Sequence, residues 1–355
     1  MDVVAKFHQL IKEAVSMQAS DLHLLTEADN VRVRLRVDGR LMDMERLTIS
    51  TGRKLISHMK FSAGMDIGER RRPQNKRLEL NIGSRTLYAR MSTFPSAMLE
   101  TVVVRIFPYD TSREMKELAL FPSQIDSLQK LILSPHGLVL LCGPTGAGKT
   151  TTLYSMLQER LKNSSENIMT LEDPVERKQD GLLQMEINEK AGVTYAAALR
   201  SLLRHDPDVI VIGEIRDEET AASAVKAAMS GHLVVSSLHS ATAAGALRRM
   251  LDLGTDPADL REVLYGIAAQ KLVDTACPFC SGACSIHCKK RRTSRRKALY
   301  EILMEEELQL CFNQLHDHHR QELPVKNFRH LLQRGVALGF ISEGDSSRIS
   351  RNARL

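Results

Sequence analysis

A glycine-rich segment near the middle of the chain has the residue types that hold phosphate groups. It matches the pattern GxxxxGK[ST] in full, follows an apolar strand-sized run at residues 138–142 and precedes a helical pattern. The glycines let consecutive backbone N–H groups wrap phosphates at a helix N-terminus, Lys149 reaches the β- and γ-phosphates, and the Thr150 hydroxyl binds Mg²⁺. The segment therefore predicts a site for ATP and Mg²⁺ that contains Gly143, Pro144, Thr145, Gly146, Ala147, Gly148, Lys149, Thr150 and Thr151.

A carboxylate follows a second apolar run, the Val-Ile-Val-Ile of residues 209–212. Ligands of open parallel sheets bind at the carboxyl ends of the strands, so we expect Glu214 to orient the attacking water and to hold the hydration shell of the metal. Many phosphate-loop proteins have an aspartate at the end of this strand, whereas here Gly213 intervenes and the acid is a glutamate. Direct and water-mediated contact with Mg²⁺ both remain open, and a solvated charge at the strand end is the alternative.

Four of the six cysteines lie within residues 277–288. Such clustering in a reducing compartment is typical of a metal site rather than of a disulfide framework. Cys277 and Cys280 have the spacing of a zinc knuckle, and Cys284 and Cys288 could complete a tetrahedral site, with His287 as the alternative fourth ligand. Structural Zn²⁺ is the favoured occupant, and free thiols or an iron–sulfur cluster are the alternatives.

Two domains are needed to position these residues. The N-terminal α/β domain, residues 1–108, begins with a helical pattern over residues 3–15, and alternating apolar residues then predict strands with a hairpin turn at Asp38-Gly39. A polar linker is expected at residues 109–122. The second domain, residues 123–355, contains the phosphate-binding segment and the cysteine-rich region. Apolar runs alternate there with helical patterns, which indicates a parallel sheet with crossover helices; the runs are 138–142, 168–171, 209–212 and 233–236.

Four sequence blocks in order resemble the traffic ATPases of type II secretion and type IV pili. They are residues 143–150, 170–176, 213–217 and 231–239, which are similar to the family's Walker A, Asp box, Walker B and His box segments. Further likeness in the first domain extends the resemblance over most of residues 1–290. It implies a RecA-like P-loop domain, preceded by a smaller PAS-like domain, in a hexameric ring. The compact cysteine cluster departs from family members that have two CxxC pairs far apart.

The resemblance also implies roles for individual residues. Arg90 and Arg105 would reach nucleotide bound by the same or a neighbouring subunit, and the acidic box would bring Glu172 close to Mg²⁺ and the attacking water. His232 and His239 would sense the γ-phosphate and relay its presence to the subunit interface. The alternatives are a solvated strand face for the arginines, a surface acidic loop for the glutamate and structural roles for the histidines.

Composition limits the location and the partners. The chain of 355 residues carries a net charge of +6, and it has neither a signal peptide nor an apolar run of the roughly 20 residues that cross a bilayer. A cytoplasmic protein is therefore expected. The basic run at residues 289–297 could contact DNA, acidic lipid or an acidic partner, but a solvated face is its commonest meaning. No aromatic residue is interleaved in it, so direct nucleic-acid binding is not favoured.

The resemblance, which is closest to the ATPases of Gram-positive competence systems, implies an ATP-hydrolysing motor that assembles a competence (DNA-uptake) pseudopilus or a related type II/IV filament. The resemblance implies a homo-hexamer at the inner face of the cell membrane, peripherally bound, that acts on an integral-membrane platform protein. A C-terminal Ala-Ile-Arg-Asn-Leu motif, usual in retraction motors of the family, is absent, which favours assembly. A RecA-like nucleic-acid translocase and a nucleotide-gated scaffold with little turnover are the alternatives.

Overall fold

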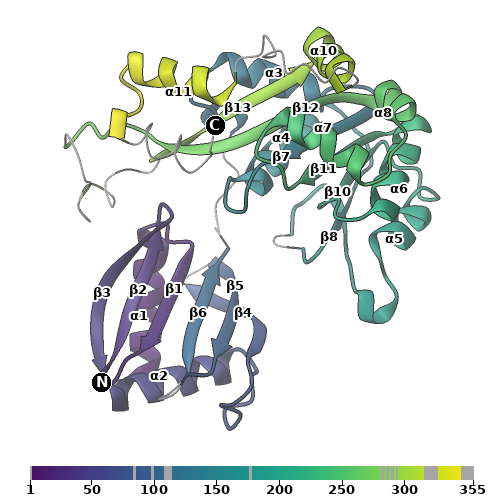
Figure 1. Ribbon diagram of the computed structural model, residues 1–355. Coiled ribbons are helices and arrows are strands. Elements are labelled where there is room, and N and C mark those ends of the chain that lie inside the picture. The colour runs from purple at the N-terminus through teal and green to yellow at the C-terminus, as the bar shows by residue number, and fades with distance from the viewer. Residues whose placement is uncertain are drawn as a thin grey trace. The chain divides into compact units, whose positions relative to one another are not determined.

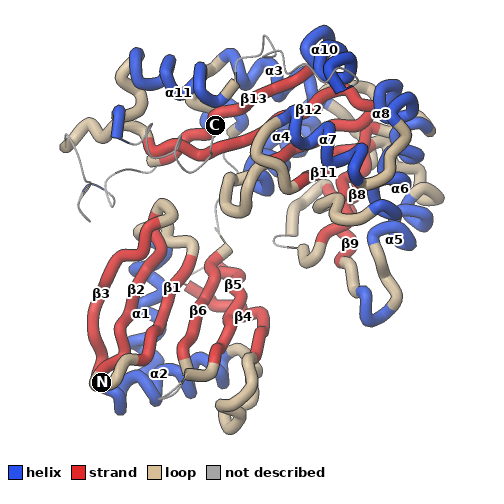
Figure 2. The backbone as a smooth tube through the Cα atoms, viewed as in Figure 1, coloured by secondary structure: helices blue, strands red, loops and turns tan. Residues whose placement is uncertain are grey.

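The structure is a computed structural model in which the chain forms two compact units (Figures 1 and 2). One unit is Met1–Thr111 with Cys277–Arg295, and the other is Ser112–Ala276 with Arg296–Leu355. The described residues are 2–82, 85–96, 100–107, 114–175, 178–280, 284, 288, 292, 295–315 and 327–344. Glu176 of the acidic box, His287 and most of the basic run lie outside them.

The first unit is built on a six-stranded antiparallel sheet with the strand order β3-β2-β1-β6-β5-β4 (Figure 2). Two helices pack against each other and against β1. The elements are α1 (Val3–Ser16), β1 (Asp21–Thr26), β2 (Asn30–Val37), β3 (Arg40–Thr48), α2 (Ile49–Ser62), β4 (Gln74–Ile82), β5 (Arg85–Phe94) and β6 (Thr101–Ile106).

The alternation in β2 explains how this sheet covers its core. Every second residue of the strand, beginning at Val31, is buried, while the arginines between them are partly exposed. The turn that follows has φ of 53° at Asp38 and 78° at Gly39, and two positive φ values are what a two-residue hairpin of type I′ requires. Side-chain period and turn chemistry therefore agree on the β2–β3 hairpin.

The second unit contains a seven-stranded sheet with the order β13-β12-β7-β11-β10-β8-β9, parallel except for the antiparallel β13. Its strands are β7 (Gly137–Cys142), β8 (Ile168–Glu172), β9 (Leu182–Glu186), β10 (Val209–Ile212), β11 (Leu233–Leu238), β12 (Leu264–Asp274) and β13 (Arg296–Met304). Its helices are η1 (Met115–Glu117), α3 (Ser123–Ile132), α4 (Lys149–Asn163), η2 (Glu189–Ala191), α5 (Tyr195–Leu202), α6 (Glu218–Met229), α7 (Ala243–Asp252), α8 (Pro257–Val263), α10 (Glu305–Leu315) and α11 (Phe328–Ala337).

Both faces of this sheet are covered by apolar layers. Leu138 and Leu140 of β7 contribute to one core cluster, and Val139 and Leu141 of the same strand contribute to the other. A strand buried on both faces reads as a continuous apolar run, which is why β7, β8, β10 and β11 are evident in the sequence. These four strands are neighbours in the centre of the sheet.

Two segments belong to other parts of the chain than the sequence predicts. Part of the expected linker is built into the second unit, because Leu118 and Leu120 form backbone hydrogen bonds with Ala298 of β13. The cysteine-rich residues 277–295, expected in the second domain, are grouped with the first unit. Among the described residues, no helix has both the length and the apolar character needed to cross a membrane.

Candidate nucleotide-binding site

The phosphate-binding segment joins the end of β7 to the first residue of α4. Gly148 caps this helix with a φ of 89°, a left-handed conformation that glycine adopts without steric cost. The Lys149 ammonium donates to the carbonyl oxygens of Gly143 at 2.7 Å and Pro144 at 3.4 Å, so the cation lies over the loop. Burial lowers the pKa of Lys149, and the charge of Glu214 acts in the opposite direction.

The loop fits a nucleotide phosphate with its metal ion. Backbone N–H groups at the start of the 15-residue helix α4 are free of helical partners, and the side chain of Thr150 is exposed in the first turn. An added Cβ at Gly146 would meet no atom within 4 Å, so the outer side of the loop is open. A lysine, a hydroxyl and helix N-terminal amides together are the donor set that a phosphate and Mg²⁺ need.

Glu214 lies just beyond the carboxyl end of β10, where the sequence predicts a catalytic acid. Its carboxylate contacts the guanidinium of Arg216 and lies 3.2 Å from Nε2 of His239. The carboxylate raises the pKa of Arg216. The side chain of Glu214 is 16% exposed, so it is held by its neighbours and still open to water. The fold thus brings Lys149, Glu214 and His239 to the same edge of the sheet.

Glu172 is held in a more closed environment at the end of β8. One carboxylate oxygen accepts from the Tyr154 hydroxyl at 2.7 Å, and the other accepts from Thr170 at 2.7 Å and Gln184 at 3.0 Å. Glu172 is 9% exposed. Among the described residues, its hydrogen-bond partners lie on α4, β8 and β9.

The two histidines of the last sequence block lie at opposite ends of β11. His239 follows the carboxyl end, beside Glu214, whereas His232 precedes the first residue and its Nδ1 contacts the carbonyl of Ala227 at 3.0 Å. A strand of six residues is about 20 Å long. The structure therefore places only His239 at the phosphate edge of this chain.

Three arginines of the first unit form a row across the adjacent strands β4, β5 and β6. Arg90 of β5 is paired with Arg105 of β6, and Arg77 of β4 is paired with Arg90 on the other side. All three are exposed, and Arg105 donates to the buried Asp21 at 3.0 Å. No motif in the sequence marks Arg77. Its place in the row depends on strand register, which no local pattern reveals.

The four clustered cysteines converge, as their spacing predicts. Their sulfur atoms all lie within 4.8 Å of one another, and those of Cys280 and Cys284 are 3.7 Å apart. Tetrahedral bonding to zinc at about 2.3 Å would place neighbouring sulfurs about 3.8 Å apart. The Phe279 backbone N–H lowers the pKa of Cys277 to about 6, while burial raises that of Cys284 to about 11.

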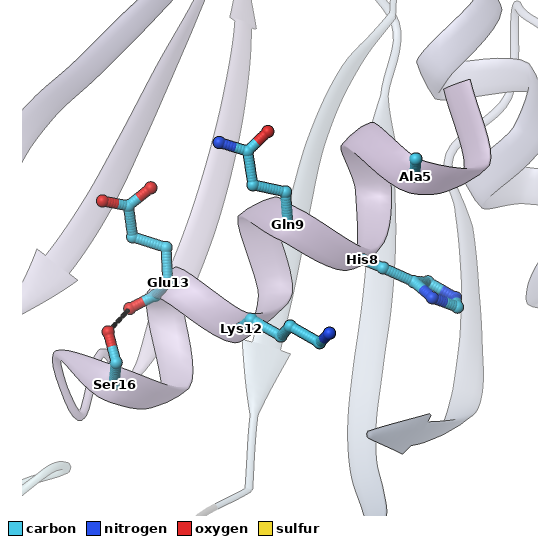
Figure 3. Close-up of a pocket in the computed structure, with 6 residues that line it drawn as sticks. All are labelled: Ala5, His8, Gln9, Lys12, Glu13 and Ser16. Carbon is cyan, nitrogen blue, oxygen red and sulfur yellow. Dashed lines mark hydrogen bonds between the residues drawn. The ribbon is translucent and has the colours of Figure 1, made fainter. Parts of the chain in front are cut away.

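A separate groove follows α1 in the first unit (Figure 3). It contains none of the residues of the phosphate loop. Its lining consists of side chains from one face of the helix, namely Ala5, His8, Gln9, Lys12, Glu13 and Ser16.

Comparisons with known proteins identify the family of this chain. Residues 2–348 match the family model described as type II/IV secretion system protein. The chain is 42% identical over 350 residues to competence protein ComGA of Bacillus subtilis, covering 98% of each. It is also 42% identical over 279 residues to type II secretion system ATPase E of Vibrio cholerae, of whose length it covers 55%.

Solved structures confirm the predicted fold class. The Legionella pneumophila ATPase DotB superposes with a TM-score of 0.75 at 22% identity, with 98% of this chain and 96% of that one covered. The pilus retraction motor PilT with bound ADP superposes with a TM-score of 0.67 at 28% identity, with 96% and 95% covered. The phosphate loop, the acidic strand end beside it and the match over nearly the whole chain lead to one conclusion: this chain belongs to the type II/IV secretion system protein family.

Proposed function

We propose that this protein is an ATP-hydrolysing motor that powers assembly of a competence pseudopilus or a related type II/IV filament. The observation that carries the proposal is the meeting of Lys149, Glu214 and His239 at one sheet edge beside the phosphate loop. The names of its relatives, a competence protein and a secretion ATPase matched at 42% identity, support the choice of system.

The side chains at this edge divide the work of hydrolysis. The loop amides and Lys149 bind the phosphates, and Thr150 holds Mg²⁺, which offsets phosphate charge. Glu214 orients the attacking water, and His239 holds the carboxylate of Glu214 in place. Three hydrogen-bond donors, the side chains of Tyr154, Thr170 and Gln184, hold the carboxylate of Glu172. Glu172 lies near Mg²⁺ and the attacking water. We assign no phosphate contact within this chain to His232, because it lies at the opposite end of β11.

The arginines of the first unit and the cysteine cluster have roles in the ring and in its stability. Exposed arginines at positions 90 and 105 supply cations to nucleotide in a homo-hexameric ring, where guanidinium suits the phosphate charge. The ring is cytoplasmic, binds peripherally at the inner face of the cell membrane and acts on an integral-membrane platform protein. The four converging cysteines hold a structural Zn²⁺, since four thiolates leave no open coordination position.

Steady-state ATPase activity of the purified protein tests this proposal. Activity is measured alone, with platform protein in lipid vesicles and with DNA, for the wild type, Glu214→Gln and the matched control Glu219→Gln. Glu219 is an exposed acid on α6 that pairs with Arg200 at 3.3 Å. We expect the platform protein to stimulate ATPase activity and DNA not to. Glu214→Gln should lose turnover by about 100-fold or more and still bind ATP, whereas Glu219→Gln should keep its turnover.

Two results would overturn the proposal. ATPase activity that is stimulated by DNA but not by the platform protein would identify a nucleic-acid translocase. ATP binding without measurable turnover in every condition would identify a nucleotide-gated scaffold.

A further inference from the structure

A buried glutamine connects the phosphate loop to the edge of the sheet. Gln270 of β12 is 3% exposed, and its Nε2 donates to the carbonyl oxygen of Ala147 at 2.8 Å. Its Oε1 accepts from the hydroxyl of Thr152, in the first turn of α4, at 2.9 Å. One side chain therefore contacts both the loop and the helix that begins at the loop.

The direction of these hydrogen bonds follows from the chemistry of the groups. The hydroxyl of Thr152 has a single hydrogen, which it donates to Gln270, so the Tyr300 hydroxyl 2.8 Å away must donate to Thr152. Burial raises the pKa of Tyr300, which keeps this donor protonated. The carbonyl of Ala147 can only accept, so a flipped amide would set two oxygens against each other. The amide of Gln270 has one allowed orientation.

The loop also packs closely against this part of β12. A Cβ added at Gly143 would lie 2.6 Å from the backbone oxygen of Gln270. One added at Gly148 would lie 3.0 Å from Nε2 of Gln270 and 3.6 Å from a methyl group of Leu272. The first and last glycines of the loop therefore lie against the same strand, and a side chain at either position would push the loop away from it.

Holding the carbonyl of Ala147 also sets the direction of the next amide. In a planar trans peptide, the C=O of Ala147 and the N–H of Gly148 point in opposite directions. With the carbonyl directed at β12, the N–H of Gly148 is directed away from β12. We propose that Gln270 is a positioning residue of the phosphate loop: it fixes the Ala147–Gly148 peptide plane so that the Gly148 N–H faces the bound phosphate. This inference rests on the proposed binding of nucleotide at the loop.

The first test is nucleotide affinity in the full-length chain. Gln270→Met keeps a side chain of similar length and removes both hydrogen bonds, so we expect the Kd for ADP, measured by calorimetry, to rise about 5- to 30-fold. The matched control is Gln124→Met. Gln124 is also buried and donates to a carbonyl of β13, that of Tyr300, at 2.5 Å, but it does not contact the loop. Gln124→Met should leave the Kd for ADP within about twofold of the wild-type value. Urea unfolding of both variants compares their losses of stability.

A second variant gives a readout that a purely structural role would not move. In Gln270→Glu, the neutral carboxyl can donate to the carbonyl of Ala147, whereas the ionised form has no donor and repels that oxygen. The affinity of this variant for ADP should therefore rise as the pH falls from about 8 to about 6, by more than any change in the wild type. Because this comparison uses only Gln270→Glu and the wild type, it decides the question even if Gln270→Met fails to fold.

Each outcome has one meaning. Equal weakening by Gln270→Met and Gln124→Met, or a Gln270→Glu pH profile parallel to that of the wild type, would overturn the positioning role. Wild-type protein that does not bind ADP would instead remove the proposed function, and this inference with it. Wild-type binding that Gln270→Met leaves unchanged would remove the inference alone.

Discussion

The imidazole Nε2 of His239 lies 3.2 Å from a carboxylate oxygen of Glu214. The two residues follow neighbouring parallel strands, β11 and β10, whose carboxyl ends meet at the same edge of the sheet. The other carboxylate oxygen of Glu214 contacts Arg216. Glu214, the proposed catalytic residue, is therefore held from two sides, by Arg216 and by His239.

Removing that imidazole should slow hydrolysis more than it weakens binding. For His239→Gln we expect kcat for ATP hydrolysis to fall about 10- to 100-fold, because a mobile Glu214 orients water poorly, while the Kd for ADP changes by less than about threefold. The control is His232→Gln at the other end of β11, which should keep kcat within about twofold. Equal loss of kcat in both variants would contradict the separation of the two histidines that the structure shows.

The cysteine cluster should contain one zinc ion per chain. Elemental analysis of purified protein should find zinc in wild type and in the control Cys311→Ala, a buried lone cysteine, but not in the double variant Cys277→Ser/Cys280→Ser. Loss of zinc should lower the free energy of unfolding, because the four-thiolate site ties residues 277–288 together. Iron with visible absorption, or four thiols that react freely in wild type, would refute the zinc assignment.

Arg295 should be important for the stability of the first unit. Its guanidinium contacts the Asp38 carboxylate at 2.9 Å and the carbonyl of Met17 at 2.9 Å, and its side chain is 6% exposed. Arg295→Met would leave Asp38 without this partner, and we expect the free energy of unfolding to fall by about 2–4 kcal/mol in urea denaturation. Arg296→Met serves as the comparison.

Arg296 pairs more loosely with Asp274, at 3.7 Å, and both side chains are about a quarter exposed or more. Arg296→Met should therefore cost less than about 1 kcal/mol. Equal costs for the two variants would show that Arg295 is no more important than an ordinary surface arginine.

Acid should weaken the second unit through the pair formed by Arg160 and Glu166. Two hydrogen bonds of 2.5 and 2.6 Å join them, and Arg160 lowers the pKa of Glu166. A carboxyl whose pKa is lowered by folding contributes stability above its unfolded pKa of about 4.3 and loses that contribution as the pH falls through the folded value. Between about pH 6 and about pH 3, the wild type should therefore lose more unfolding free energy than Glu166→Gln. Parallel stability curves for the two proteins would show that the pair contributes nothing.

The sequence by itself determined those features of this protein that depend only on residues close together in the chain. The phosphate loop is a continuous run of eight residues between a strand and a helix, and its glycines and lysine act through the backbone they belong to. The alternation in β2 and the apolar runs of β7, β8, β10 and β11 identify their elements, because side-chain period reports burial directly. The clustered cysteines lie close together in space because little chain separates them.

Tertiary structure alone decided which distant residues meet. The order β7-β11-β10-β8 is not the order of the chain, and it is this order that brings Glu214 and His239 together and leaves His232 at the far edge. The contacts of Gln270 with Ala147 and Thr152 span 123 and 118 residues of sequence. No periodicity marks such pairs, because they are selected by the packing of whole strands and helices, whose free energy is shared among many residues rather than encoded in a short pattern.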